Sequence, residues 1–359
     1  MTDCVIVGGG LIGMLTALEL VQTGQDITLV ERGSLGNESS WAGGGILSPL
    51  YPWRHPDAIT RLAVWSQQYY PGLSRTLLAE TGIDPEWIQS GLLILDSEEQ
   101  DQAAQWASRH NMHIELLDRE AIVKSEPEMD RHLEKAILMS DLAQVRNPRL
   151  LKALRQSLLN QGVTILEQTE AVALNQKNDR ISGVQTVMNK ISAGRVVITA
   201  GAWSGLILKD SGINVDVFPV RGQMLLYQTK PGLVSHILVH EGHYMIPRRD
   251  GHILVGSTVE NTGFDKSTTE QAAIELKQLA VSLVPELGNH DIKHHWAGLR
   301  PGTTTGIPYI GAHPSIEGLY VNTGHFRNGV LLGPASARLL ADIMLDRPLS
   351  LDVSPYALM

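Results

Sequence analysis

The sequence opens with a short apolar run that leads directly into a cluster of glycines. The run is Cys4 to Val7, and the cluster is Gly8-Gly9-Gly10-Leu11-Ile12-Gly13. Residues 11–21 then show a wide apolar face typical of a helix, and residues 27–30 form a second β-type run. A strand, a glycine turn, a helix and a second strand make one βαβ unit. This unit constrains the fold most, because a G-x-G-x-x-G turn in that context is typical of a dinucleotide-binding domain.

Each glycine of the G-x-G-x-x-G pattern has a physical role. Gly8 allows the tight turn, Gly10 lets a pyrophosphate approach the backbone, and Gly13 permits close packing of helix against strand. The helix N-terminus adds partial positive charge for the phosphates. Glu31 ends the second strand 23 positions after Gly8, a spacing that suits a carboxylate bound to ribose hydroxyls and disfavours the 2′-phosphate of NADP. The alternative is a glycine-rich turn without a ligand, which this full context disfavours.

Composition bounds the rest of the molecule. The 359 residues are 43% hydrophobic and 19% charged, as in globular proteins with room for two domains. A net charge of −9 argues against partners such as nucleic acid or an anionic membrane surface. The single cysteine, Cys4, excludes an internal disulfide, and no stretch approaches the ~20 apolar residues that span a bilayer. We therefore expect a cytoplasmic protein without a membrane segment.

Two later glycine-rich segments bear on which dinucleotide binds. Residues 39–47 read Ser-Ser-Trp-Ala-Gly-Gly-Gly-Ile-Leu, a run of small residues whose backbone N–H groups can approach a bulky ring or its phosphates. Taken alone, the same run is also compatible with a flexible surface loop. Residues 324–333 form a glycine turn between a strand and the last helix. A helix N-terminus there would stabilise negative charge on a reduced flavin, which favours FAD over a nicotinamide cofactor.

The order of the predicted elements suggests a discontinuous arrangement. Rossmann-like pieces occur at the start, middle and end of the chain, with β-rich material between them. Helices are expected at 57–81, 98–111, 148–160, 268–283 and 331–345. We predict an α/β fold in which a Rossmann-like FAD-binding domain is combined with a discontinuous, antiparallel-sheet α+β substrate-binding domain. The expected boundaries are 1–84, 142–217 and 302–359 for the first domain, and 85–141 and 218–301 for the second.

Five motifs together resemble a known family. The opening GGGLIG, SSWAGGGIL, AGAWS, GLRPGT at 298–303 and GHFRNG are similar to the D-amino-acid oxidase superfamily of flavoproteins, within it most to the glycine oxidases of thiamine biosynthesis. The resemblance spans essentially the whole chain and implies the fold of that family. Besides Gly8, Gly10 and Gly13 of the fingerprint, it implies these FAD contacts: Leu11, Ile12, Glu31, Arg32, Ser39, Ser40, Gly44, Gly45, Ile46, Val172, Gly201, His325, Phe326, Arg327, Asn328, Gly329, Val330 and Leu331.

The resemblance also implies a set of catalytic residues. Arg300, in GLRP, matches the arginine that holds the substrate carboxylate, and Arg327 matches one that lines the substrate site. Tyr244 matches a tyrosine that stands before a proline-basic pair. A planar guanidinium pairs with a carboxylate through two parallel bonds and so fixes the Cα–H of an amino acid. Without the resemblance, a surface ion pair is the more common place for an arginine.

The expected activity is FAD-dependent oxidative deamination of glycine or other small amino acids, such as sarcosine and small D-amino acids. Hydride transfer to flavin N5 would give a keto acid, ammonia or an amine, and hydrogen peroxide from molecular oxygen. No metal-type His/Cys spacing and no Ser/His/Asp order stands out, and hydride transfer requires no strong protein base.

Two alternatives remain at this point. One is a D-amino-acid dehydrogenase that passes electrons to an acceptor other than oxygen. The other is a flavin-binding domain that modifies a macromolecule such as tRNA, which the acidic balance disfavours. The segment Tyr51 to Pro56, with aromatics between prolines, suits either an entrance loop or a packed surface or subunit contact. The sequence leaves open whether the protein forms a homo-oligomer and whether FAD is covalently attached.

Overall fold

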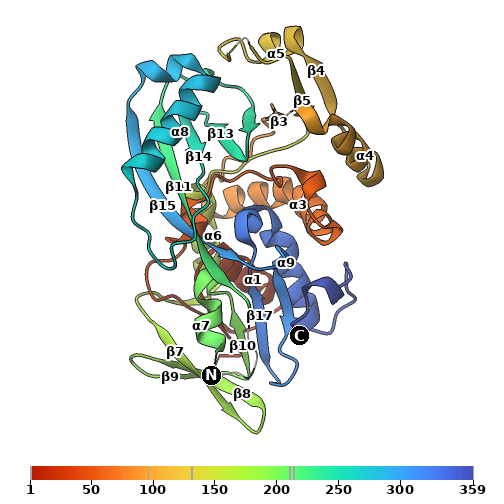
Figure 1. The fold of residues 1–359 in the computed structure, drawn as a ribbon. Helices are drawn as coiled ribbons and strands as arrows, with labels where there is room; N and C mark the ends of the chain where they lie inside the picture. Colours follow the sequence, from red (N-terminus) through yellow and green to blue (C-terminus); the bar gives the residue numbers. More distant parts are fainter. Residues whose placement is uncertain (1, 96, 131, 210–211, 213–214, 359) are drawn as a thin grey trace.

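A parallel sheet forms the centre of one part of the molecule. The computed structural model describes residues 2–95, 97–130, 132–209, 212 and 215–358. Among these, six strands form a sheet in the order β16-β17-β10-β1-β2-β6, parallel except for β16 at its edge (Figure 1). Its strands are β1 (Cys4–Val7), β2 (Ile27–Val30), β6 (Thr164–Leu166), β10 (Arg195–Ile198), β16 (Tyr309–Ala312) and β17 (Leu319–Thr323).

Both faces of this sheet are covered, which explains why its strands are continuous apolar runs rather than alternating ones. Cys4 and Ile6 of β1 pack into a core shared with helices, whereas Val5 and Val7 pack into a second core on the other face. The helices of the first core are α1 (Leu11–Val21), α3 (Asp57–Thr81), α6 (Asn147–Asn160) and α9 (Gly329–Met344). The second core involves α7 (Ser204–Leu208) and a small sheet of β7 (Ala171–Lys177), β8 (Arg180–Thr186) and β9 (Lys190–Ser192).

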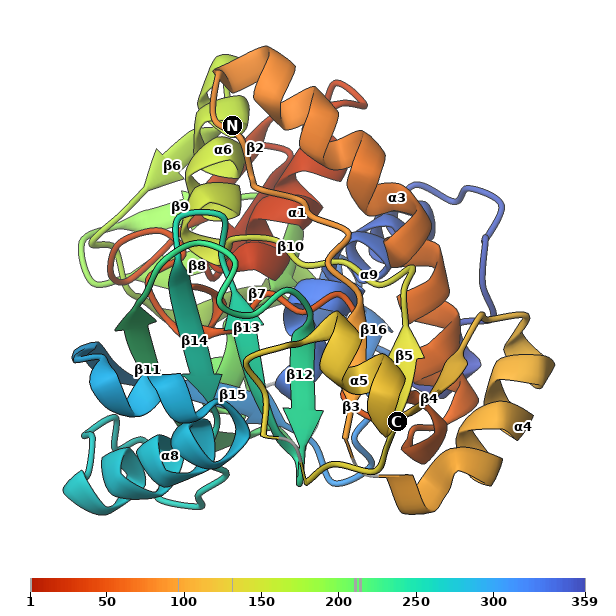
Figure 2. The same cartoon turned by 90° about the horizontal axis from the view of Figure 1, so that it is seen from above.

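A second large sheet lies beside the first and is mainly antiparallel (Figure 2). Its order is β15-β11-β14-β13-β12-β3-β5-β4, with β12 and β3 parallel. The strands are β3 (Leu92–Ile94), β4 (Glu115–Asp118), β5 (Lys135–Met139), β11 (Phe218–Gln228), β12 (Ile237–His240), β13 (His243–Pro247), β14 (His252–Gly256) and β15 (Ile292–Gly302). The accompanying helices are α4 (Gln100–His110), α5 (Arg119–Ser125) and α8 (Glu270–Leu283).

Side chains of this second sheet alternate between two environments, as the period of two in a strand requires. Leu225 and Tyr227 of β11 pack against Leu276 of α8 on one face. Met224, from the same strand, packs with Tyr244 of β13 in a different core on the opposite face. The face with Met224 and Tyr244 is the one that meets the functional cavity.

The predicted fold class is confirmed, and most predicted elements lie where the sequence placed them. Strand β11 begins at Phe218, five residues before the apolar run that starts at Gln223. Arg221 and Gly222 interrupt its apolar pattern, yet pairing with β15 on one side and a bridge between Arg221 and Glu260 on the other make this stretch a strand. The division into domains at the stated boundaries remains a prediction. Within the described residues, no helix is both long and apolar enough to cross a membrane.

Short helical turns connect these elements, and several of them border the site. Four of them fall in sequence segments named above, at residues 39–47, 51–56, 200–204 and 324–333. They are α2 (Ser39–Ala42), η1 (Pro52–Arg54), η2 (Ser97–Glu99), η3 (Gly201–Trp203), η4 (Pro285–Asn289), η5 (Phe326–Asn328) and η6 (Ser354–Tyr356).

Candidate functional site

A cavity of about 650 Å³ lies where the carboxyl ends of the parallel strands meet the second sheet. Val7, Val30 and Thr323 bring the ends of β1, β2 and β17 into its wall. Met224 and Tyr244 contribute from β11 and β13. Ligands of open α/β sheets bind at the carboxyl ends of the strands, so this position suits a cofactor.

The glycine turn forms one end of this cavity, and its shape excludes side chains. Gly8 has φ +109°, and a Cβ there would lie 2.5 Å from the carbonyl oxygen of Thr199. A Cβ on Gly13 would lie 2.0 Å from the carbonyl oxygen of Gly8. The first turn of α1 has no acidic residue, and Ser40 Oγ accepts only the Leu11 N–H, so the N–H groups that follow remain suited to phosphates. Of the predicted contacts, Gly8, Gly10, Leu11, Ile12 and Glu31 line the cavity, whereas Gly13 lies behind the turn.

Glu31 both supports the turn and faces the cavity. Its Oε2 accepts a hydrogen bond from the Gly9 N–H, and its Oε1 accepts one from the Gly33 N–H, each at 2.8 Å. A carboxylate has about four acceptor positions, so these two bonds leave others for ribose hydroxyls. The same side chain can therefore hold the turn and bind a ribose.

The predicted contacts around the next part of the wall come from distant segments. Ser40 Oγ accepts a hydrogen bond from the Leu11 N–H at 2.9 Å, which joins α2 to the start of α1. Arg32 stacks its guanidinium 3.8 Å from the ring centroid of Trp203 and pairs with Glu38 at 3.3 Å. The predicted residues of these segments that line the cavity are Arg32, Ser39, Ser40, Gly44, Gly45, Ile46, Val172 and Gly201.

The segment before α9 closes another side of the cavity. Burial lowers the pKa of His325 to about 3, so its imidazole is neutral at physiological pH. Its Nε2 is buried and has no hydrogen-bond partner in the described part of the chain. The helix α9 begins without a side-chain cap. The predicted residues of this segment and of the start of α9 that line the cavity are His325, Phe326, Arg327, Asn328, Gly329 and Val330. The predicted contact Leu331 is instead 1% exposed and packs into the helical core.

Three candidate substrate residues meet on the remaining wall. Arg300 donates to Ser257 Oγ at 2.6 Å and to the Thr258 carbonyl at 3.1 Å. Arg327 donates to the Gly242 carbonyl at 2.8 Å. Burial, aided by the positive charge of Arg300 and opposed by two tyrosines, lowers the pKa of Arg327. Tyr244 is 8% exposed and directs its hydroxyl to Met224 Sδ at 3.7 Å.

Several cavity residues were not predicted from the sequence. Gly222 and Met224 stand two positions apart on β11, so the period of two could have assigned them to one face once the strand was known. Gly242 also lines the cavity, whereas His240 and His243 do not. Tyr51, Arg54 and His55 line it too, which favours the entrance-loop interpretation of that segment. The described residues contain no cluster of three or more His, Cys, Asp or Glu side chains that would suit a metal ion.

Comparison with known proteins agrees with this geometry. The family model described as FAD dependent oxidoreductase matches residues 3–343. The chain belongs to this family. It is 49% identical to a glycine oxidase of Pseudomonas aeruginosa over 354 residues, which covers 98% of this chain and 97% of the relative. The corresponding values for a glycine oxidase of Pseudomonas putida are 45%, 98% and 97%. The crystal structure of glycine oxidase from Geobacillus kaustophilus superposes with a TM-score of 0.95 at 28% identity, covering 100% of this chain and 98% of that one.

These findings confirm the resemblance stated from the sequence and show that the cofactor is FAD. The residues of the cavity fit that group. A side-chain-free turn at an uncapped helix start suits its pyrophosphate, and Glu31 suits its ribose. The unpartnered Nε2 of His325 is a polar atom that still lacks a hydrogen-bond partner beside the cavity.

Proposed function

We propose that this protein is an amino-acid oxidase that deaminates glycine or another small amino acid, such as sarcosine or a small D-amino acid. With glycine, the amino acid, oxygen and water would yield glyoxylate, ammonia and hydrogen peroxide. Bound FAD would supply the redox chemistry by taking a hydride from the substrate Cα and passing the electrons to oxygen. The two Pseudomonas relatives named glycine oxidase support the choice of substrate.

The observation that carries the proposal is a pair of arginines in the cavity wall without carboxylate partners. Neither Arg300 nor Arg327 forms an ion pair among the residues that the structure describes. Buried cations are normally paired, so an unpaired cation facing a cavity is suited to an anionic ligand. The carboxylate of an amino acid has the charge and the planar shape that a guanidinium binds through two bonds.

Residues around these arginines would orient the substrate rather than take its proton. Tyr244 can donate its hydroxyl to the same carboxylate, in place of its weak contact with Met224. Fixing the carboxylate fixes the direction of the Cα–H, which lowers the entropic part of the barrier. Three glutamates line the described cavity wall: Glu31 and Glu38 near the end suited to the ribose, and Glu170 near Val172. None of the three lies beside Arg300. Hydride transfer requires a neutral amine, so the substrate amine would lose its proton to solvent beforehand rather than to a carboxylate of this wall.

The direct test is the visible spectrum of the purified enzyme under anaerobic conditions. Addition of glycine, sarcosine or D-alanine should bleach the flavin absorption band. If none of the three bleaches the band, the proposed substrate class is wrong. Readmission of oxygen should then restore the band and release one hydrogen peroxide for each substrate oxidised. Reduction of an artificial dye without peroxide would favour a dehydrogenase instead.

A further inference from the structure

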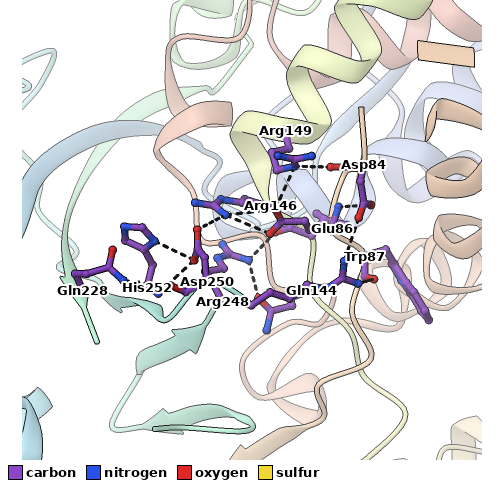
Figure 3. A network of polar contacts seen from close by, with 12 residues as sticks. Asp84, Glu86, Trp87, Gln144, Arg146, Arg149, Gln228, Arg248, Asp250 and His252 are labelled. Atoms are coloured by element: carbon purple, nitrogen blue, oxygen red, sulfur yellow. Dashed lines mark hydrogen bonds and ion pairs between the residues drawn. The ribbon is translucent and has the colours of Figure 1, made fainter. Parts of the chain in front are cut away.

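We propose that Arg248 is a positioning residue that orients the Gly43–Gly45 turn, so that backbone N–H groups of this turn face the FAD cavity. Arg248 directly follows β13, the strand that carries Tyr244. The proposal concerns the cofactor cavity, and it holds whichever amino acid the enzyme oxidises. Figure 3 shows Arg248 within a network of charged and polar side chains.

The contacts of Arg248 join three separate segments. Its Nη2 donates to the Gly44 carbonyl at 2.6 Å, and its Nη1 donates to the Val145 carbonyl at 3.0 Å and to Gln144 Oε1 at 2.6 Å. The side chain is 6% exposed, and no carboxylate lies within ion-pair distance of it in the described residues. Burial lowers its pKa to about 10, with Arg146 adding to the effect and Glu86 and Asp250 opposing it, so it remains a cation at neutral pH. Because this buried cation donates to backbone carbonyls and not to a carboxylate, we infer that it serves to fix the position of those carbonyls.

Carbonyl contacts fix the whole turn in one orientation. Asn147 Nδ2 donates to the Gly43 carbonyl at 3.0 Å, Arg248 binds the Gly44 carbonyl, and the Val145 N–H donates to the Gly45 carbonyl at 2.9 Å. In a trans peptide the N–H points opposite to the C=O of the same unit. The three contacts therefore direct the N–H groups of the next residues away from these partners. Those residues are Gly44, Gly45 and Ile46, and all three line the cavity.

These N–H groups are available to a ligand. None of the three has a hydrogen-bond acceptor among the residues that the structure describes. Buried backbone N–H groups are rarely left without a partner, so three in succession beside a cofactor cavity indicate donors for that cofactor. Arg248 controls the middle one, because the Gly44 carbonyl and the Gly45 N–H belong to the same peptide unit.

The turn has no room to adopt this orientation with other residues. A Cβ on Gly44 would lie 2.5 Å from Ile246 Cδ1 and 3.1 Å from Tyr244 Cε2. Gly45 has φ +82°, and a Cβ there would lie 2.0 Å from the Val145 carbonyl oxygen. The backbone of the turn thus packs directly against the strand that leads to Arg248. Through this contact, Arg248 also fixes the turn relative to Tyr244.

An arginine is required because its planar fork reaches two carbonyls at once. A lysine at the same place carries one ammonium group, which would hold one carbonyl well and leave the other without its donor. Around the fork, Arg146 pairs with Glu86 and Asp250 at 3.3 and 2.8 Å, so those carboxylates already have partners (Figure 3). The Arg248 guanidinium can therefore donate its hydrogen bonds to the Gly44 and Val145 carbonyls.

The test compares the holoenzymes of Arg248→Lys and Arg248→Met with a neighbour control. Arg249 is the matched control, because it is exposed at its guanidinium and binds Asp84 at 3.0 Å outside the cavity. For each variant, the FAD released by ultrafiltration gives the dissociation constant, and the visible spectrum reports the environment of the bound flavin. We expect the FAD dissociation constant to rise about tenfold or more in Arg248→Lys, as for a lost hydrogen bond to a charged group, with a shifted flavin band. Arg249→Met should match the wild type in both.

A purely structural role predicts a different pattern. In that case Arg248→Lys would keep the flavin spectrum and the FAD dissociation constant of the wild type while its thermal midpoint falls, and the proposal would be wrong. Failure of Arg248→Lys to fold would equally contradict it, because the residue would then serve the fold rather than the turn. If instead glycine fails to bleach the flavin of every variant and of the wild type, the substrate proposal fails, while the FAD measurements still decide the role of Arg248.

Discussion

Two arginines on neighbouring strands of the second sheet have opposite environments. Arg221 of β11 stands opposite Leu299 of β15, and Arg300 stands opposite Val220, one step along the same ladder. Because side chains alternate, Arg221 projects to the face covered by α8, and Arg300 projects to the cavity. Arg221 pairs with both Glu260 and Asp265, whereas Arg300 has no carboxylate partner among the described residues. Carboxylates of the chain thus neutralise Arg221, which stabilises the fold, whereas the positive charge of Arg300 on the other face remains for a ligand.

Removing the cavity arginine should have the largest effect on activity. In Arg300→Met, kcat/KM for the amino-acid substrate should fall about a hundredfold or more, since losing one partner of a buried charge pair costs about 2–5 kcal/mol. The thermal midpoint should fall only modestly, because Arg300→Met removes hydrogen bonds to neutral acceptors, Ser257 Oγ and the Thr258 carbonyl among them, and no ion pair among the described residues. Steady-state kinetics and a thermal melt measure both. Arg300→Lys should recover part of the activity, and an unchanged kcat/KM in Arg300→Met would show that the carboxylate binds elsewhere.

For Arg221, on the face covered by α8, we expect a loss of stability with little change in activity. Arg221→Met should lower the free energy of unfolding by about 2 kcal/mol, less than for a fully buried pair because Glu260 and Asp265 keep access to solvent. Its kcat/KM should stay within about twofold of the wild type, as for a change that leaves the cavity untouched. Urea unfolding of the two holoenzymes measures the first quantity. A loss of activity without a loss of stability would reverse the roles assigned to the two faces.

The pH dependence of stability should separate the same two arginines. Burial alone would raise the pKa of Glu260, but hydrogen bonds from Thr258, Arg221 and Gln223 outweigh it and lower the pKa below the ordinary 4.5. The folded protein therefore releases this proton more readily than the unfolded chain. The stabilisation is present above the unfolded pKa and is lost as the pH falls through the lower folded pKa. In urea unfolding between pH 7 and pH 3, Arg221→Met should lose less stability than the wild type, whereas Arg300→Met should follow the wild-type curve.

This contrast explains what the sequence could and could not predict. The βαβ unit follows from local signals alone, because the apolar run, the glycines and Glu31 lie within the first 31 residues. Arg300 was found only through the family resemblance, since its pattern does not separate it from Arg221. Which of the two faces the cavity depends on pairing between β11 and β15, whose residues are about 80 positions apart in the sequence.

The same limit applies at the start of α9. The resemblance implied that both Val330 and Leu331 contact FAD, yet only Val330 lines the cavity. Successive residues of a helix point about 100° apart, so Leu331 turns into the core beneath the sheet instead. Similarly, Gly222 and Gly242 show no motif, and only the assembled walls reveal that they border the substrate side. Local pattern therefore located the cofactor end of the cavity better than the opposite wall.

Gly222 allows the comparison to be tested with a single added methyl group. A Cβ at this position would lie 2.0 Å from Arg300 Nη2, and 2.2 Å from both Cζ and Nη1. The backbone of Gly222 does not have a positive φ, so alanine fits the strand and the flexible guanidinium must move instead. We expect Gly222→Ala to raise KM for glycine about tenfold, the effect of weakening one charge-assisted bond, with a near-normal thermal midpoint. Gly311→Ala in β16 is the matched control, because a Cβ there meets no atom within 4 Å. If Gly222→Ala leaves KM unchanged, as the control Gly311→Ala should, substrate binding does not depend on the position of the Arg300 guanidinium.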